Sequence, residues 1–308
     1  MSSRLPSLAR EGDGPAVNCH KDQNMPKISI VTDTDSSLPA ALAEQHQIRQ
    51  VPMTVHFGSE AYKSNEEIDD ARLFARINRE GKLPTTSAPS PGQFEEAFQS
   101  ALDGGAETVI CFCVSSAVSA AYKAALTARE MLPRRDIEVV DTQSVSLGEA
   151  FMALGAAEAA QAGASKAEVL ARAQDIGRRT RLYAALPTLK YLAMSGRVGY
   201  LAAGLASVLN IQPVLTIREG KLDLLERVRT RTKAWARVIE LAVEAAGGRP
   251  VEQLAFLHVN ALPDAREFAD KLRERLPLPA STFFAELTPG LSVHSGDGLV
   301  GVVLVSEK

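Results

Sequence analysis

Cysteine is scarce in this chain of 308 residues, which has only Cys19, Cys111 and Cys113. So few thiols cannot build a disulfide framework, and they leave too few ligands for a cysteine-based zinc site. Cys111 and Cys113 lie two residues apart in the apolar stretch "TVICFC". This spacing predicts a buried strand that holds both thiols as small core side chains on one face. Unpaired cysteines also fit a reducing compartment, so we expect a cytoplasmic protein.

Aromatic residues and net positive charge are low as well. Aromatic side chains make up 5% of the chain, and the formal net charge is −3. Proteins that bind nucleic acids usually carry a basic surface, often with aromatic platforms on which bases stack. We therefore expect no nucleic-acid partner.

Long apolar runs are also missing. Residues 1–26 contain prolines and scattered charges but no apolar run of a signal peptide, so we expect them to form a flexible N-terminal tail. The longest stretch without a charged residue, 198–217, is interrupted by glycine, asparagine, glutamine and proline. We expect it to form a buried helix that runs into a buried strand, and we expect no transmembrane segment.

The remaining sequence predicts an α/β protein of two domains. In residues 27–165, β-branched runs alternate with amphipathic helical segments, which favours a parallel sheet covered by helices. In residues 166–308, two strand-like runs flank a turn at Glu219 and Gly220, which indicates antiparallel pairing. We therefore expect an N-terminal parallel-sheet α/β domain and a C-terminal α+β domain with a largely antiparallel sheet.

Hydroxyl and carboxyl side chains follow the predicted strands of the first domain. They form the segments "DTDSS" at 33–37, "SSAVS" at 115–119 and "DTQS" at 141–144. A loop rich in hydroxyls and prolines, "LPTTSAPSPG" at 83–92, is expected to be rigid and irregular. The carboxyl ends of parallel strands share one edge of a sheet, where helix N-termini also favour anions. The pattern predicts a pocket for a small anion, although such residues also serve simply as helix caps.

Motifs for catalysis and cofactor binding are missing from the sequence. It has no phosphate-binding P-loop, no G-x-S-x-G nucleophile elbow and no H-E-x-x-H metal motif. Gly296, Gly298 and Gly301 match G-x-G-x-x-G, but a predicted strand follows them where the dinucleotide motif needs a helix. We therefore expect no cofactor and no metal. His294 lies in "SVHSGDG", which predicts a turn, and it is either a surface residue or a donor that the second domain delivers to the anion site.

The chain resembles the DegV family over residues 27–308. The resemblance rests on seven blocks in order: "VTDTDSS", "PTTSAPSP", "SSAVSAAY", "VVDTQSVSLG", "LKYLAMSGRVG", "NIQPVLTIREGKL" and "VHSGDGLVG". It implies two α/β domains that enclose a fatty acid, with the acyl chain in a tunnel of the first domain and the carboxylate held by hydroxyls at the domain junction. It also implies that the acid is presented to a separate fatty acid kinase for phospholipid synthesis, as some members do.

The family motifs imply the site residues. Thr86, Ser119 and His294 match the carboxylate partners, and Ser87, Ser116 and Gly296 of the same motifs complete the ligand-binding set. The chain departs from the family pattern at Ala120 and Ala121, because Ser-Gly-Thr is usual where this chain has Ser119-Ala120-Ala121, and at Asp297, which replaces a proline.

The Ala-rich stretch "AFMALGAAEAAQAGA" bears on where an acyl chain would lie. Its small side chains predict a channel between helix and sheet, although close helix packing is the alternative. Our main hypothesis is a non-catalytic carrier of a palmitate-like long-chain fatty acid. The alternative is a small-molecule hydrolase or transferase that uses Ser119 and His294.

A basic segment suggests a partner-docking surface. No Asp or Glu occurs between residues 177 and 218, a stretch that includes Arg197. Arg227, Arg229 and Arg231 then alternate, which would place them on one face of a predicted strand at 221–231. These arginines favour docking of an acidic partner, either a kinase or an anionic membrane surface, or they form a solvated basic face.

Overall fold

The computed structural model describes residues 27–133, 135–197 and 211–308. The predicted N-terminal tail and the predicted helix at the start of 198–217 lie outside these residues. The end of that stretch forms a strand, as expected. Within the described part of the chain, no helix has the length and apolar character needed to cross a membrane.

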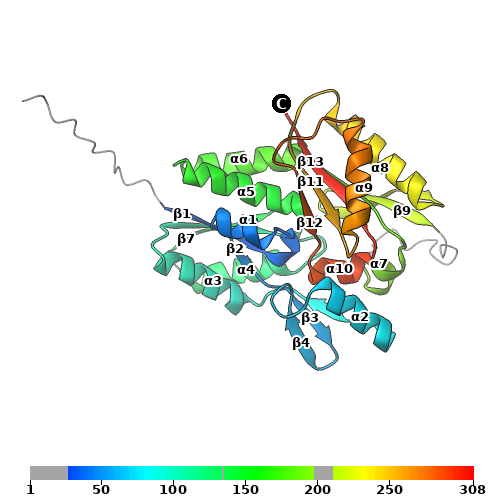
Figure 1. Ribbon diagram of the computed structural model, residues 1–308. Coiled ribbons are helices and arrows are strands. Elements are labelled where there is room, and N and C mark those ends of the chain that lie inside the picture. The colour runs from blue at the N-terminus through cyan, green and yellow to red at the C-terminus, as the bar shows by residue number, and fades with distance from the viewer. Residues whose placement is uncertain (1–26, 134, 198–210) are drawn as a thin grey trace, which may run out of the picture.

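The first half of the chain builds a parallel four-stranded sheet in the order β2-β1-β6-β7, which confirms the predicted parallel sheet (Figure 1). Its strands are β1 (Ile28–Asp33), β2 (Arg49–Val51), β6 (Thr108–Cys113) and β7 (Asp136–Asp141). Helices α3 (Pro91–Asp103) and α4 (Ala121–Met131) cover one face, and α5 (Leu147–Gln161) covers the other. A short helix, α1 (Ala40–Gln45), connects β1 to β2.

Strand β6 shows how the sequence pattern sets these layers. Cys111 and Cys113 face α3 and α4, while Ile110 and Phe112 face α5. The two thiols are fully buried, with their sulfur atoms 3.7 Å apart, so both cysteines are small core side chains on one face, as predicted.

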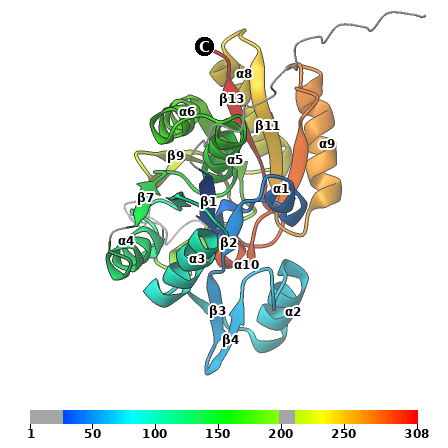
Figure 2. The same cartoon turned by 90° about the vertical axis from the view of Figure 1, so that its left-hand side faces the viewer.

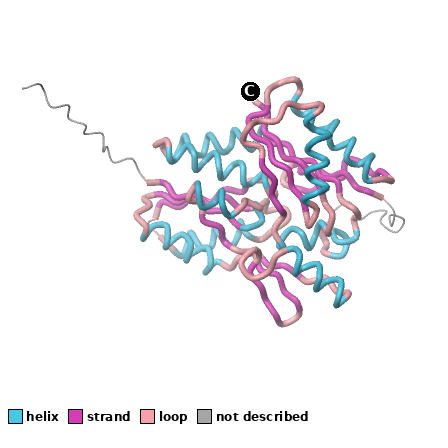
Figure 3. Tube along the Cα trace, in the orientation of Figure 1, coloured by secondary structure: helices cyan, strands magenta, loops and turns pink. Residues whose placement is uncertain are grey.

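The second half builds a second sheet, whose strands are drawn in magenta in the upper part of Figure 3. It has six strands in the order β10-β9-β8-β13-β11-β12. Every neighbouring pair is antiparallel except β11 and β12, which confirms the largely antiparallel character. The strands are β8 (Thr180–Ala185), β9 (Gln212–Arg218), β10 (Lys221–Val228), β11 (Val251–His258), β12 (Phe283–Glu286) and β13 (Val300–Ser306). Helices α8 (Arg231–Ala246) and α9 (Leu262–Arg273) cover its outer face.

Helix α5 lies between the two large sheets, and α6 (Lys166–Arg179) packs along it (Figure 2). Because α5 contacts both sheets, it is buried from Leu147 to Ala157. Its small residues allow close packing: a Cβ at Gly155 would lie 2.0 Å from the Ile176 side chain. One apolar core therefore joins the two halves, and the predicted boundary at residue 165 falls between two helices that pack together.

A small antiparallel sheet extends from the first half below the parallel sheet (Figure 1). It consists of β3 (Thr54–Phe57), β4 (Glu60–Lys63) and β5 (Thr85–Ser87), flanked by α2 (Asp70–Glu80). Strand β5 corrects our expectation of an irregular loop at 83–92, because backbone pairing with β3 orders its first half. The second half of the loop starts α3, with Ser90 as the cap and Pro91 in the first turn.

Candidate ligand-binding site

A cavity of about 660 Å³ lies where the two large sheets meet, at the carboxyl ends of β1 and β6 and beside the start of α5. Asp35 reaches it after β1, Ser116 and Ser119 after β6, and Ser146 before α5. The cavity thus lies at the sheet edge that the sequence indicated, where open parallel sheets bind ligands. The volume is within the usual range of small-molecule pockets, about 300–1,000 Å³.

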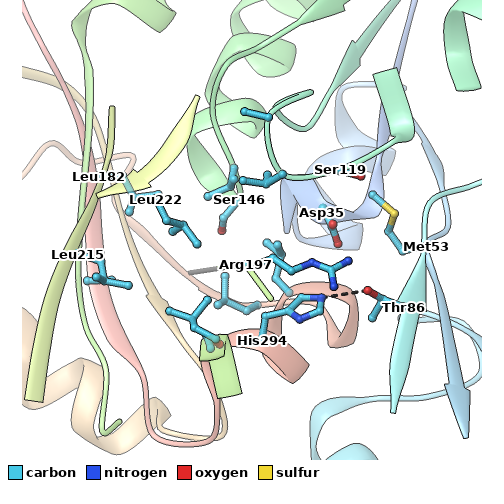
Figure 4. Close-up of a pocket in the computed structure, with 18 of the residues that line it drawn as sticks. Asp35, Met53, Thr86, Ser119, Ser146, Leu182, Arg197, Leu215, Leu222 and His294 are labelled. Carbon is cyan, nitrogen blue, oxygen red and sulfur yellow. Dashed lines mark hydrogen bonds between the residues drawn. The ribbon is translucent and has the colours of Figure 1, made fainter. Parts of the chain in front are cut away.

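One side of the cavity is apolar and comes from the second half of the chain (Figure 4). The side chains that form it are Leu182, Ala184, Leu186, Leu192, Leu215, Leu222, Leu257, Leu287, Leu291 and Leu299. The Ala-rich helix α5 contributes no residue beyond its N-cap, Ser146. This cavity therefore does not run along the helix, where Gly155 packs closely against Ile176 of α6, and the channel beside α5 stays a prediction.

The opposite side of the cavity is polar, and it brings Thr86 and His294 together. Thr86 Oγ1 and His294 Nε2 lie 2.9 Å apart, although the residues come from opposite ends of the chain (Figure 4). Register between β5 and β3 places Thr86 opposite Val55. Burial and the nearby Arg197 guanidinium lower the pKa of His294 to about 3, so the imidazole is neutral at physiological pH.

His294 lies in a short helix, α10 (Pro289–Ser295), rather than in the predicted turn. Three contacts fix this helix to the first half of the chain. The Ser292 hydroxyl donates to Asp70 at 2.7 Å, the Gly290 N–H donates to the Ser64 hydroxyl at 3.2 Å, and Thr288 N–H donates to Ser37 at 3.4 Å. Burial raises the pKa of Asp70 to about 8. These contacts set the position of His294 at the cavity.

Arg197 lies in the cavity, which corrects its assignment to a docking surface. It follows α7 (Lys190–Met194), and its guanidinium donates to the Ser195 carbonyl at 2.7 Å. Figure 4 shows the guanidinium beside the His294 ring and the Asp35 carboxyl. Arg197 belongs to the family block that contains "SGRVG", which could have marked it as a site residue. The sequence does not show, however, that its side chain points into the cavity.

Asp35 is a second cavity residue that was noted only as part of a strand end. Its side chain is 7% exposed, and its Oδ1 has no hydrogen-bond partner in the described structure. Burial and the neighbouring Asp33 raise the pKa of Asp35 well above its usual range, while Arg197 opposes this shift. The polar end therefore combines a cation, a neutral histidine and an acid that burial disfavours in its charged form.

The three predicted serines, Ser87, Ser116 and Ser119, all line the cavity, but they differ in whether their hydroxyl is already used in a hydrogen bond. The Ser119 hydroxyl accepts from Ala121 N–H at 3.2 Å, which leaves its own hydrogen available. The Ser116 hydroxyl donates to Asp141, and the Ser87 hydroxyl pairs with His56 Nε2 at 2.9 Å. Of these three serines, Ser119 is therefore the one whose hydroxyl hydrogen is free, and the Ser146 hydroxyl in the same lining also has no partner.

Gly296 does not line the cavity. It ends α10 with a φ of 85°, and a Cβ there would lie 2.5 Å from the Tyr191 ring, so glycine is needed for close packing. The departures from the family pattern differ in their relation to the cavity, because Ala120 lines it between Ser119 and Lys123 and Asp297 does not. Asp297 is exposed and does not line the cavity, and Ala120 provides no side-chain cap for α4.

The geometry does not support the alternative hypothesis of a Ser119–His294 catalytic pair. His294 Nε2 is paired with Thr86, and the structure has no hydrogen bond between Ser119 and His294. Within the described residues, no cluster of His, Cys, Asp and Glu side chains could hold a metal ion.

The prediction that Arg227, Arg229 and Arg231 lie on one face of a strand is also wrong. Strand β10 ends at Val228, and Arg231 is the first residue of α8. Arg231 pairs with Asp264 at 2.6 Å and lies over the Trp235 ring at 4.7 Å. Arg227 and Arg229 remain exposed.

Comparison with known proteins identifies the family to which this chain belongs. Residues 27–307 match the family described as "Uncharacterised protein, DegV family". The chain belongs to the DegV family. A DegV domain-containing protein of Streptomyces coelicolor is 36% identical over 280 residues, which cover 91% of this chain and 99% of the relative.

Solved DegV structures share the whole architecture. A DegV family protein from Thermus thermophilus, described for its fatty acid binding, has a TM-score of 0.85 and 32% identity, and the match covers 91% of this chain and 100% of that one. DegV from Bacillus subtilis, described as a fatty acid binding protein, has a TM-score of 0.80 and 28% identity, with 91% and 99% covered.

Proposed function

We propose that this protein binds one long-chain, palmitate-like fatty acid without chemically changing it. The observation that carries this proposal is a single cavity with one polar end and one leucine-lined end. An amphiphile with a small anionic head and a long apolar tail matches both ends. The fatty-acid binding described for the Thermus thermophilus and Bacillus subtilis relatives supports the same ligand class.

In this proposal the carboxylate lies among Thr86, Ser119 and Arg197. The neutral His294 supports Thr86: with its proton on Nε2, the imidazole donates to Thr86 Oγ1 and leaves the threonine hydrogen free for the ligand. Arg197 supplies the opposite charge, and a hydrogen bond to a charged group contributes about 1.5–3 kcal/mol. The polar end thus orients the ligand and selects a carboxylate.

The acyl chain would lie against the leucines of the second sheet. Each methylene that leaves water contributes about 0.8 kcal/mol, so a chain of about fifteen methylenes contributes more than 10 kcal/mol before entropy costs. The tail therefore provides most of the affinity. This placement differs from a tunnel within the first domain, because the apolar lining comes from β8, β9, β10 and β11 and the segments around α7 and α10.

We expect protein purified from an expression host to carry a fatty acid in a ratio of about one to one. Native mass spectrometry would measure the bound mass, and lipid extraction would identify the acid. Delipidated protein should then take up palmitate but neither release nor modify it. Protein that contains no fatty acid and takes up none after delipidation would contradict the proposal.

We further propose that the bound acid is presented to a fatty acid kinase, with the exposed Arg227 and Arg229 as part of the docking surface. Exposed like charges add little to folding but raise the rate of association with an acidic partner. Arg227 belongs to β10, and this strand and its partner β9 also reach the cavity through Leu222 and Leu215. Arg231 has a structural role instead, through Asp264 and Trp235.

Arg229→Glu is expected to leave palmitate binding intact but slow kinase-dependent formation of acyl phosphate, most strongly at low salt. The reversed charge repels an acidic partner, and salt screens the effect. Arg266→Glu is a matched control, because Arg266 is an exposed arginine on α9. If Arg229→Glu supports phosphorylation as well as the parent at both low and high salt, these arginines do not dock the kinase.

A further inference from the structure

Asp35 is held rigidly at the polar end of the cavity. Its backbone N–H donates to Asp33 Oδ1 at 2.9 Å, and its carbonyl accepts from Ser146 N–H at 2.8 Å. The glycine at 290 makes room for the carboxyl, since a Cβ there would lie 2.4 Å from Asp35 Oδ1. Oδ1 is nevertheless left without a hydrogen-bond partner, as is the neighbouring Thr288 hydroxyl, although the Asp35 side chain is more than nine-tenths buried. A buried polar atom without a partner indicates that something else completes the site.

The charges around Asp35 disfavour a site in which Asp35 and a ligand carboxylate are both ionised. Asp33 of β1 and Glu149 of α5 are buried acids behind it. On the cavity side lie Arg197 and the neutral His294, and Lys123 of α4 also lines the cavity. A fatty-acid carboxylate beside Arg197 would share this cation with Asp35. Two carboxylates in one desolvated site cannot both be ionised at low cost, so one of them keeps a proton.

We propose that Asp35 is the specificity residue that receives the ligand's carboxylate as a neutral acid and donates its O–H to it. The pair then holds one proton, and Arg197 balances the single negative charge that remains. When Asp35 is ionised in the empty protein, it takes one proton from water as the anion binds. This inference rests on the proposed function and adds that fatty-acid binding is linked to protons through Asp35.

The linkage has a defined sign. While Asp35 is already protonated in the empty protein, the anion binds without proton uptake. Once pH rises above the pKa of Asp35 in the empty protein, each binding event takes up a proton. Affinity for the anion then falls by about tenfold for each further pH unit. A ligand with an uncharged head, such as a fatty alcohol, does not need this proton.

The experiment compares binding of laurate and of dodecanol to delipidated protein between about pH 6 and about pH 9, by titration calorimetry. The parent protein is expected to lose laurate affinity as pH rises, and Asp35→Asn to give a flat profile, because its amide remains a neutral donor. Glu149→Gln is the matched control: Glu149 is buried near Asp35 but does not line the cavity, so this variant should keep the slope. Dodecanol affinity should stay level with pH in all three proteins.

Two results would overturn the proposal. One is a fall in laurate affinity with rising pH that is equally steep in the parent and in Asp35→Asn. The other is laurate affinity at about pH 6 that stays unchanged in Asp35→Ala, which has no donor at this position. Uptake that approaches one proton per laurate at the alkaline end, measured in two buffers that differ in ionisation enthalpy, supports the proposal. Failure of the parent to bind laurate at the acidic end would instead contradict the proposed function itself.

Discussion

Replacing Arg197 with methionine should weaken palmitate binding by about two to three and a half orders of magnitude. The substitution keeps a long side chain but removes the cation beside the ligand carboxylate. Loss of one partner from a buried charge pair costs about 3–5 kcal/mol, and each 1.4 kcal/mol corresponds to tenfold in affinity. Calorimetric or fluorescent-ligand titration of delipidated protein would measure the loss.

The effect should depend on charge rather than on packing. Arg197→Lys is therefore expected to recover part of the affinity, and binding of a fatty alcohol should change little in either variant. Equal losses for palmitate and for the alcohol would show that the cavity had changed shape. Unchanged palmitate affinity in Arg197→Met would remove Arg197 from the carboxylate site.

A bulky side chain at the apolar end of the cavity should cause a comparable loss of affinity, but only for fatty acids with long acyl chains. Ala184 lies in β8 and lines the cavity, so Ala184→Phe places a ring where we propose that the tail lies. If the ring excludes about five methylenes, the loss is about 4 kcal/mol, or roughly a thousandfold in palmitate affinity. Binding of octanoate should be nearly unchanged, which would shift the preferred chain length downward.

The control for this variant is Ala193→Phe. Ala193 is exposed on α7 and does not line the cavity, so the same added bulk should leave the preferred chain length as it is. A scan of ligands from octanoate to stearate would compare the two variants. Equal losses for short and long acids in Ala184→Phe would place the tail elsewhere or indicate a general loss of folding.

Local sequence patterns were sufficient to predict most of the fold. Strand β6 is apolar on both faces, and α2 ends at Gly81 in a left-handed conformation, so both elements follow from pattern and from stop signals. The predictions of secondary structure failed where strand pairing or helix capping outweighed the local sequence pattern. Thr85–Ser87 form a strand because β3 provides hydrogen-bond partners, although prolines surround them. Arg231 starts a helix because Thr230 caps it.

The predicted position of the anion site followed from the sequence because parallel strands bring their carboxyl ends to one edge. The sequence also contained Thr86 and His294 as candidates, but it could not show that their side chains meet at 2.9 Å. That contact depends on how the second half of the chain packs against the small sheet. Arg197 was assigned to the surface because a basic segment without acids looks the same whether its side chains point inward or outward.

The sequence by itself determined the parallel sheet, the antiparallel sheet, the family and the edge at which a ligand would bind. These features depend on periodicity and on motifs, which are local. The tertiary structure alone decided that α5 is buried between the two sheets, that the leucines of the second sheet line the cavity, and that Arg197 and Asp35 face it. Burial, charge pairing and cavity shape depend on residues far apart in the chain, so they exist only once the two halves have packed together.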